Sequence, residues 1–195
     1  MGIGYTSAGM PQPVTPNAPA ALQSLLQTKF ADSGIQVVDL ASGGRASNLM
    51  NLLDGMDGGG APFAQRLASN QASIVVLSYG LNDQYGSESP SDFSGYLTQA
   101  IQTAQIAGRT VVLEEPSPTC DSDHPHLADY AAAIDAAGKT LGVPVIQQYA
   151  FIESVQGWEA HMDGSCTVPD AYLDAIKAQQ ELTVLAPLVQ NLIKG

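Results

Sequence analysis

The apolar positions of the chain change repeatedly between helical and strand-like spacing. Leu22, Leu25 and Leu26 recur at the spacing of one helix face in "PNAPAALQSLLQTKF", which predicts a helix over residues 16–30. Two apolar runs follow, "GIQVVDL" at 34–40 and "ASIVVLSYG" at 72–80. Their length and β-branched residues predict strands, and the second run is typical of a strand in the middle of a parallel sheet.

The alternation of helices and strands continues to the end of the chain. "LMNLL" indicates a short helix, and "DGGGAPF" at 57–63 indicates a loop. The later segments are predicted to be a helix over 91–108 that begins on a serine cap, a strand over 109–115, a helix over 126–142, a strand over 143–149 and a closing helix over 169–193, with Pro187 as a candidate break point. This order predicts a layered α/β fold with a mostly parallel sheet. A length of 195 residues without an internal break predicts a single domain over 1–195.

Composition and charge narrow the classes of partner. Hydrophobic residues make up 45% of the chain and charged residues 13%, which is typical of a globular domain. Seven Lys and Arg against nineteen Asp and Glu give a net charge of -12. This charge repels nucleic-acid phosphates and anionic lipids, so we expect neither as a partner. No apolar run approaches the length of about 18 residues that crosses a bilayer, and "MGIGYTSAGM" lacks the features of a signal peptide.

Glycines and polar residues follow two of the predicted strands. Ligands of parallel sheets bind beyond the carboxyl ends of the strands, so the loops that begin at 41, 79, 116 and 150 should open on one edge. Asn82, in "LSYGLNDQYG", could aim its amide at a developing oxyanion, and the N–H of Gly44, in "VVDLASGGRAS", could point into the same cleft. Each motif by itself is also an ordinary turn, so both interpretations stay open at this point.

Taken in order along the chain, "VVDLASGG", "VVLSYGLND" and "DGSCTVPDAY" resemble the SGNH (GDSL-type) hydrolase family, over essentially the whole chain. The resemblance implies a flavodoxin-like α/β/α sandwich and serine-dependent ester hydrolysis, including the removal of acetyl groups from carbohydrates. It implies that Gly44 and Asn82 are oxyanion donors, that Asp163 is the acid of the triad, and that Cys166 stands where the family has its histidine. The implied substrate is a small ester or an acylated carbohydrate, and no cofactor is implied.

The first departure from the family concerns the nucleophile. No Gly-Asp-Ser occurs in the sequence, and "MGIGYTSAG" leads directly towards the first helix. We therefore expect an SGNH domain that starts one strand late; Thr6 and Ser7 are candidate substitutes for the nucleophile, with a plain loop as the alternative. The missing strand would lie between 36–40 and 74–78. We expect a gap or a repairing contact there, or else low stability with self-association through the exposed sheet.

The second departure is Cys166, because a thiol cannot replace imidazole as a general base at neutral pH. "CDSDHPH" offers His124, three residues after Asp121, as a base, although an aspartate at this place also caps the next helix. His161 is a further candidate. The three histidines lack the ligand spacing of a metal site, so no metal is expected.

Cys120 and Cys166 are the two cysteines of the chain. The loops that carry them leave the same edge of the expected sheet, so we predict a disulfide between them, with two buried thiols as the alternative. The disulfide would draw His124 towards the cleft, and it favours a secreted or periplasmic location.

Three hypotheses for the function follow. The first is an SGNH-type ester hydrolase whose activity is impaired because its serine nucleophile is absent. The second is a non-catalytic module that binds a carbohydrate or another ligand on a hydrolase fold, with Tyr79, Tyr85 and Trp158 as candidate stacking surfaces. The third is a purely structural α/β domain, in which the motif matches are accidental.

Overall fold

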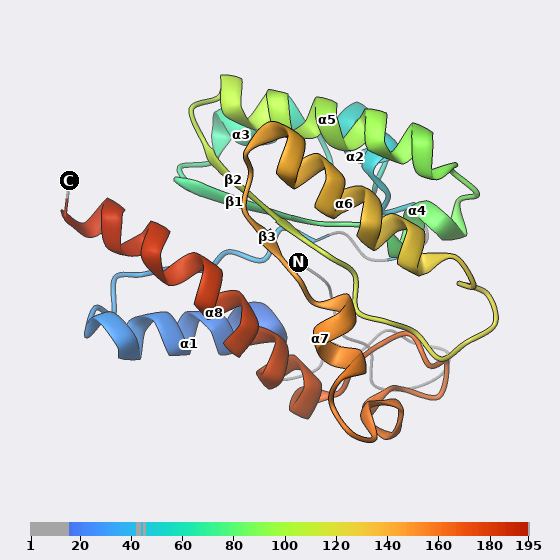
Figure 1. Ribbon diagram of the computed structural model, residues 1–195. Helices are drawn as coiled ribbons and strands as arrows, with labels where there is room; N and C mark the ends of the chain where they lie inside the picture. Colours follow the sequence, from blue (N-terminus) through green and yellow to red (C-terminus); the bar gives the residue numbers. More distant parts are fainter. Residues whose placement is uncertain (1–15, 42–43, 45, 195) are drawn as a thin grey trace.

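The computed structural model describes residues 16–41, 44 and 46–194 (Figure 1). In chain order, its elements are α1 (Ala18–Phe30), α2 (Leu49–Asp54), α3 (Phe63–Ser69), β1 (Ile74–Ser78), α4 (Leu81–Tyr85), α5 (Pro90–Ile106), β2 (Thr110–Glu114), α6 (Leu127–Leu141), β3 (Val145–Ile146), α7 (Tyr149–Glu153), the 3₁₀ turn η1 (Trp158–His161) and α8 (Ala171–Lys194). From β1 onward, helices follow each strand as the apolar pattern predicts, whereas α1, α2 and α3 follow one another without a strand between them.

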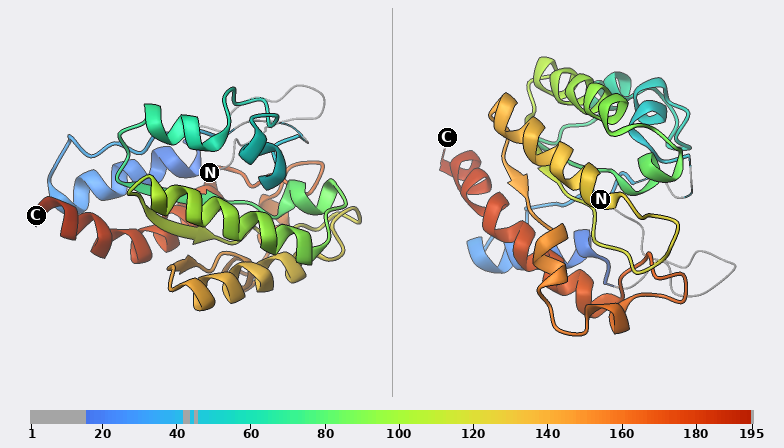
Figure 2. Two further views of the ribbon diagram at one scale, coloured as in Figure 1. Left: turned by 90° about the horizontal axis from the view of Figure 1, so that it is seen from above. Right: turned by 45° about the vertical axis from the view of Figure 1, so that its right-hand side comes forward.

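The strands form a parallel sheet between two layers of helices. Within the described residues the sheet has three strands in the order β1-β2-β3, with Val76 opposite Val112 and Leu113 opposite Val145. Helices α2, α3, α5 and α6 cover one face, and α1 and α8 cover the other (Figures 1 and 2). The structure therefore confirms the predicted α/β/α sandwich with a parallel sheet.

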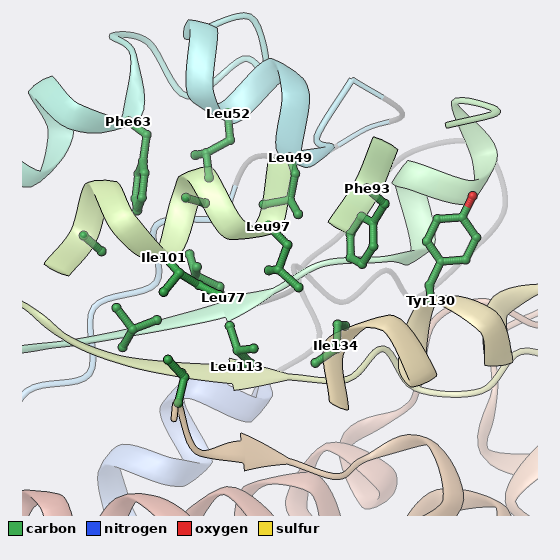
Figure 3. Packing of buried hydrophobic residues seen from close by; sticks show 14 of the residues in the cluster. Leu49, Leu52, Phe63, Leu77, Phe93, Leu97, Ile101, Leu113, Tyr130 and Ile134 are labelled. Carbon is green, nitrogen blue, oxygen red and sulfur yellow. The ribbon is translucent and has the colours of Figure 1, made fainter. Parts of the chain in front are cut away.

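Two apolar clusters hold the helical layers on the sheet. Val111 and Leu113 of β2 point into the first cluster, where Phe93 and Leu97 of α5 are completely or almost completely buried (Figure 3). Val112 lies between them in sequence and points into the second cluster, beneath α1 and α8. Successive side chains of a strand point to opposite faces, so the central strand has to be apolar on both.

Helix ends occur at the residues that favour them. The Asn17 side chain accepts a hydrogen bond from the Ala20 N–H at the start of α1. Ser89 caps α5 and Pro90 occupies its first turn, so the cap lies two residues before the serine that we predicted. Helix α6 ends on Gly142, whose φ of 66° is favourable for glycine.

The predicted strand over 34–40 does not form. The segment is not assigned to a strand, and within the described residues no ladder joins it to β1. Its backbone bonds instead to side chains of α1: the Val37 N–H donates to Gln23 at 2.9 Å, and the Ile35 carbonyl accepts from Gln27 at 2.8 Å. A cavity of about 1400 Å³, lined by this segment and by β1, lies where we expected a gap. A strand needs a neighbour to pair with, and the cavity separates this segment from β1.

Other boundaries also differ from the prediction. Helix α8 continues through Pro187, because packing along α1 supports it on both sides of the proline. The short helices α3, α4 and α7 were not predicted, since runs of five to seven residues show little periodicity. Strand β3 has only two of the predicted seven residues. No helix in the described ranges is long and apolar enough to cross a membrane.

Candidate active-site cleft

The structure brings three of the predicted site residues to the wall of one cavity. Gly44, Asn82 and Asp163 all line the cavity of about 1400 Å³. Asn82 follows β1, and Ser117, which also lines the cavity, follows β2. We call the part of the cavity lined by Gly44, Ser47, Asn82, Ser117 and Asp163 the cleft. It lies beyond the carboxyl ends of β1 and β2, where ligands of such sheets bind.

The Asn82 side chain is held against the turn that carries Gly44. Its amide nitrogen donates to the Gly44 carbonyl at 3.3 Å and to the Ser47 carbonyl at 3.2 Å. Gly44 has a φ of 92°, which strains any residue with a side chain. The two predicted oxyanion donors are therefore neighbours, but a ligand oxygen would have to replace one of the two carbonyls as the acceptor of the amide.

Asp83 fixes the position of this pair and was not singled out by the sequence analysis. Its carboxylate accepts from the Leu49 N–H and the Gly80 N–H, both at 2.8 Å, and so joins the start of α2 to the end of β1. Burial raises the pKa of this fully buried carboxyl to about 6, although the backbone hydrogen bonds act to lower it. The signal in the sequence was an aspartate three residues after Gly80, at the third position of α4, which we had interpreted only as part of a turn.

Asp163 organises its own loop. Its carboxylate accepts from the Ser165 hydroxyl at 2.8 and 2.7 Å and from the Thr167 and Val168 N–H groups at 3.1 Å. Burial acts to raise the pKa of Asp163, but these hydrogen bonds outweigh it, so the pKa is lowered. The carboxylate stays ionised at neutral pH.

Cys166 is joined to Cys120 in a disulfide, as we predicted, with 5.2 Å between the Cα atoms. The Cys120 N–H also donates to the Cys166 carbonyl at 3.2 Å. The bond ties the loop after β2 to the loop that carries Asp163. Cys166, which we expected at the position of the histidine base, is therefore half of a disulfide, which cannot accept a proton.

His124 does not line the cavity. Its side chain is 6% exposed, and its Nδ1 lies 2.9 Å from each carboxylate oxygen of Asp121. The ring also packs against Tyr85, with 5.9 Å between the ring centroids. The Asp121–His124 spacing is thus a real contact, but neither residue lines the cleft.

The other histidines lie elsewhere. His161 contacts Asp170 at 3.0 Å and stacks on Tyr172, with 4.2 Å between the ring centroids. His126 lies near Asp129 at the surface. All three histidines of the chain fall within the described residues, and none of them lines the cavity.

A group of buried charges also lines the cavity. Glu114 ends β2 and is 2% exposed; its carboxylate accepts from the Gln148 amide at 3.0 Å. Lys177 and Glu181 of α8 line the cavity beside it. Burial acts to raise the pKa of Glu114, but the charge of Lys177 outweighs it and the pKa is lowered. Burial together with the Glu114 charge raises the pKa of Glu181 well above its usual value. The sequence analysis missed this group because Glu114 lies far along the chain from Lys177 and Glu181.

The candidate stacking residues differ in their placement. Tyr79 lines the cavity, whereas Tyr85 packs on His124. Trp158 is 9% exposed and packs with Ile152 and Leu173, so the prediction that it offers a stacking surface is wrong. In the part of the chain that the structure describes, no group of three or more His, Cys, Asp or Glu side chains is arranged to hold a metal ion.

Comparison with known proteins agrees with this architecture. The model of the GDSL-like lipase/acylhydrolase family matches residues 4–167 of the chain. No curated protein matches.

Solved structures match over most of the chain. A catalytic mutant of Axe2, an acetylxylan esterase from Geobacillus stearothermophilus, is 15% identical and covers 93% of this chain and 84% of its own, with a TM-score of 0.72. TesA is 18% identical and covers 87% of this chain and 90% of its own, with a TM-score of 0.61. LAE5, an alpha/beta hydrolase from the metagenome of Lake Arreo in Spain, is 14% identical and covers 86% of this chain and 80% of its own, with a TM-score of 0.67. At these identities the likeness shows the fold.

Proposed function

The chain belongs to the GDSL-like lipase/acylhydrolase family, and from this premise we propose that its cleft binds small esters or acylated carbohydrates and that the 195-residue chain hydrolyses them slowly. The observation that carries the proposal is the convergence of Gly44, Asn82 and Asp163 on one cavity beyond the ends of β1 and β2. These residues come from loops that are far apart in sequence, so a single local turn does not explain why they lie together.

In this proposal each residue has a separate part. The Gly44 N–H and the Asn82 amide stabilise the oxygen of an acyl group as charge develops on it. Asp163, ionised and held by its loop, would orient a base. Acetylated carbohydrate is a reasonable substrate class because Axe2, which has a similar fold, acts on acetylxylan. For this chain, that substrate class is part of the proposal.

Slow turnover follows from what the printed sequence and the cleft contain. The sequence has no Gly-Asp-Ser, and Cys166 is bonded to Cys120. Thr6 and Ser7, the candidate substitutes, lie outside the described residues. In serine hydrolases, oxyanion and binding effects without a working triad leave only about 10³–10⁴-fold acceleration over water.

A non-catalytic ligand-binding module is the second candidate. It is favoured by the hydrogen bonds within the cleft, where the Asn82 amide already donates to two carbonyls and the Asp163 carboxylate already accepts from its own loop. Such a site is arranged to be stable, and it would bind an acylated sugar without turning it over.

The test compares the 195-residue chain with a variant that carries an added N-terminal strand ending in Gly-Asp-Ser. We expect hydrolysis of p-nitrophenyl acetate by the unmodified chain to stay far below ordinary enzyme rates, with no labelling by a fluorophosphonate probe. The added strand should introduce labelling, and a matched strand ending in Gly-Asp-Ala should not. Ordinary esterase rates from the unmodified chain that Ser7→Ala abolishes would overturn the proposal and identify Ser7 as the nucleophile.

The same variant decides which group serves as the base. His124 as the base stays a prediction, and labelling of the extended chain without further change would support it or another imidazole. Labelling that requires Cys166→His, with Cys166→Ala as the control, would show that His124 is not the base. If no variant is labelled, but NMR shows that acetylated xylo-oligosaccharides shift the Gly44 and Asn82 signals, the chain is a binding module.

A further inference from the structure

We propose that Tyr172 and His161 form a sugar-binding platform beside the cleft, on which one ring of a neutral carbohydrate stacks while its acyl group enters the cleft. We call these two stacked rings, together with the Asp170 carboxylate that holds His161, the aromatic platform. The inference rests on the proposed function, because it takes an acylated carbohydrate as the ligand. It assigns the sugar part of that ligand to residues outside the cavity.

The aromatic platform is held in a fixed arrangement. The ring centroids of His161 and Tyr172 lie 4.2 Å apart, with 30° between the ring planes. The Nδ1 of His161 lies 3.0 Å from one carboxylate oxygen of Asp170, and the other oxygen accepts from the Tyr172 N–H at 2.9 Å. Both residues are therefore positioned by the same carboxylate, so little conformational freedom is lost when a ligand stacks on the rings.

One face of the Tyr172 ring is open to a ligand. His161 covers the ring from one side, and Tyr172 nevertheless remains 53% exposed. Within the described residues, His161 is the one ring that stacks on it. A tyrosine ring combines a flat apolar face with a polar edge. The C–H groups of a sugar ring also form an apolar face that is surrounded by hydroxyls, so the two surfaces match.

A short antiparallel hairpin places the aromatic platform next to the cleft. The Asp170 N–H donates to the His161 carbonyl at 2.8 Å. The Asp163 N–H donates to the Val168 carbonyl, also at 2.8 Å, and both of these residues line the cavity. Residues 161 and 163 therefore lie about 7 Å apart on one strand of the hairpin, and their side chains leave it on the same face. A sugar that stacks on Tyr172 has an acyl group on its ring within reach of the cleft.

The polar groups at the edge of the platform favour a neutral sugar. Because the Nδ1 of His161 donates to a carboxylate, Nε2 of the neutral ring is left as an acceptor, and no described residue bonds to it. A sugar hydroxyl can donate to this nitrogen or to the Asp170 carboxylate, whose side chain is 49% exposed. The net charge of -12 repels anionic ligands. The ligand is therefore an uncharged molecule that carries both an apolar face and hydroxyl groups.

NMR titration of the full 195-residue chain with acetylated xylo-oligosaccharides tests the platform and the cleft together. We expect the signals of His161 and Tyr172 to shift with those of Gly44 and Asn82, at one dissociation constant. Unacetylated xylo-oligosaccharides should shift the platform signals alone, because they have no acyl group for the cleft. Shifts at Gly44 and Asn82 without shifts at the platform would overturn the inference and leave the proposed function intact.

A small ester without a sugar, p-nitrophenyl acetate, probes the cleft by itself. If no xylo-oligosaccharide binds but slow hydrolysis of this ester is measured, the aromatic platform is refuted and the proposed function stands. If the xylo-oligosaccharides shift the platform signals, but neither they nor the ester shift Gly44 and Asn82, the platform is supported and the proposed function of the cleft fails.

Two variants of Tyr172 measure the contribution of the exposed ring. Tyr172→Ala removes the ring and should weaken the binding of acetylated xylo-oligosaccharides about five- to tenfold, which corresponds to one lost aromatic contact. Tyr172→Phe keeps the ring and should change the dissociation constant by less than about twofold. Unchanged NMR signals of the buried Phe93 and Leu97 show that both variants are folded. Equal binding by the two variants would overturn the inference.

His161→Phe tests the polar edge of the platform. The variant keeps a ring against Tyr172 but removes Nε2 and the bond to Asp170. We expect it to weaken the binding of acetylated xylo-oligosaccharides about two- to tenfold, which corresponds to one lost hydrogen bond. The binding of benzyl acetate, which has an aromatic ring in place of the sugar, should not weaken. If the unmodified chain binds benzyl acetate more tightly than the acetylated sugars, the platform takes an aromatic alcohol and the inference is wrong.

Discussion

Removing the disulfide by changing both Cys120 and Cys166 to serine should lower the free energy of unfolding by about 4 kcal/mol. The bond closes a loop with a sequence separation of 46. In the chain-entropy model, a loop of that size removes about 13.5 cal/mol/K from the unfolded chain, which corresponds to about 4 kcal/mol at 25 °C. The hydrogen bond from the Cys120 N–H to the Cys166 carbonyl, which is retained in the variant, is worth only about 1 kcal/mol. The covalent constraint is therefore the larger contribution.

Urea unfolding of the oxidised chain and of the double variant measures this difference directly. For a domain of this size we expect the midpoint of thermal unfolding to fall by about 8–16 °C. We also expect a steeper dependence on urea, because an unfolded chain without the cross-link exposes more surface. Reductant should bring the original chain close to the variant and leave the variant unchanged. A loss below about 1 kcal/mol, or free thiols in the denatured, unreduced chain, would refute the reasoning.

Two further predictions concern single positions. Gly138→Ala in α6 should lower the free energy of unfolding by about 1–3 kcal/mol, because a Cβ there would lie 2.3 Å from the Val145 side chain and 2.9 Å from the Val143 carbonyl. Gly95→Ala in α5, where a Cβ would have nothing within 4 Å, should instead raise the free energy of unfolding by about 0.5–1 kcal/mol. Urea unfolding that ranks the two variants in the opposite order would contradict the packing argument. Asp83→Asn should remove a pH dependence of the free energy of unfolding. The folded-state pKa of Asp83, about 6, exceeds the ordinary value of 3.8, so its contribution to stability is complete below about pH 4 and falls by up to about 3 kcal/mol as the pH rises through 6. If the two chains differ in stability by the same amount from pH 4 to 7, the pKa is not raised.

Local sequence determined the order of the elements and most of their ends. The apolar run of β2 has to be buried on both faces, which places it inside a parallel sheet, and the caps Asn17 and Ser89 begin helices because their side chains accept hydrogen bonds from nearby backbone groups. The disulfide between Cys120 and Cys166 was also predictable, because both loops leave the same edge of the sheet.

Tertiary structure decided which of these residues meet. The segment over 34–40 has the composition of a strand, but a strand forms only where a neighbour supplies the other half of the ladder, and here α1 side chains take that place. The Asp121 and His124 spacing predicted a contact correctly, yet no local pattern could show that neither residue lines the cleft. The bond from Asn82 to Gly44 spans 38 positions, and the grouping of Glu114 with Gln148 spans 34. Contacts at such separations depend on how the helical layers pack on the sheet, and the spacing of residues along the chain does not predict that packing.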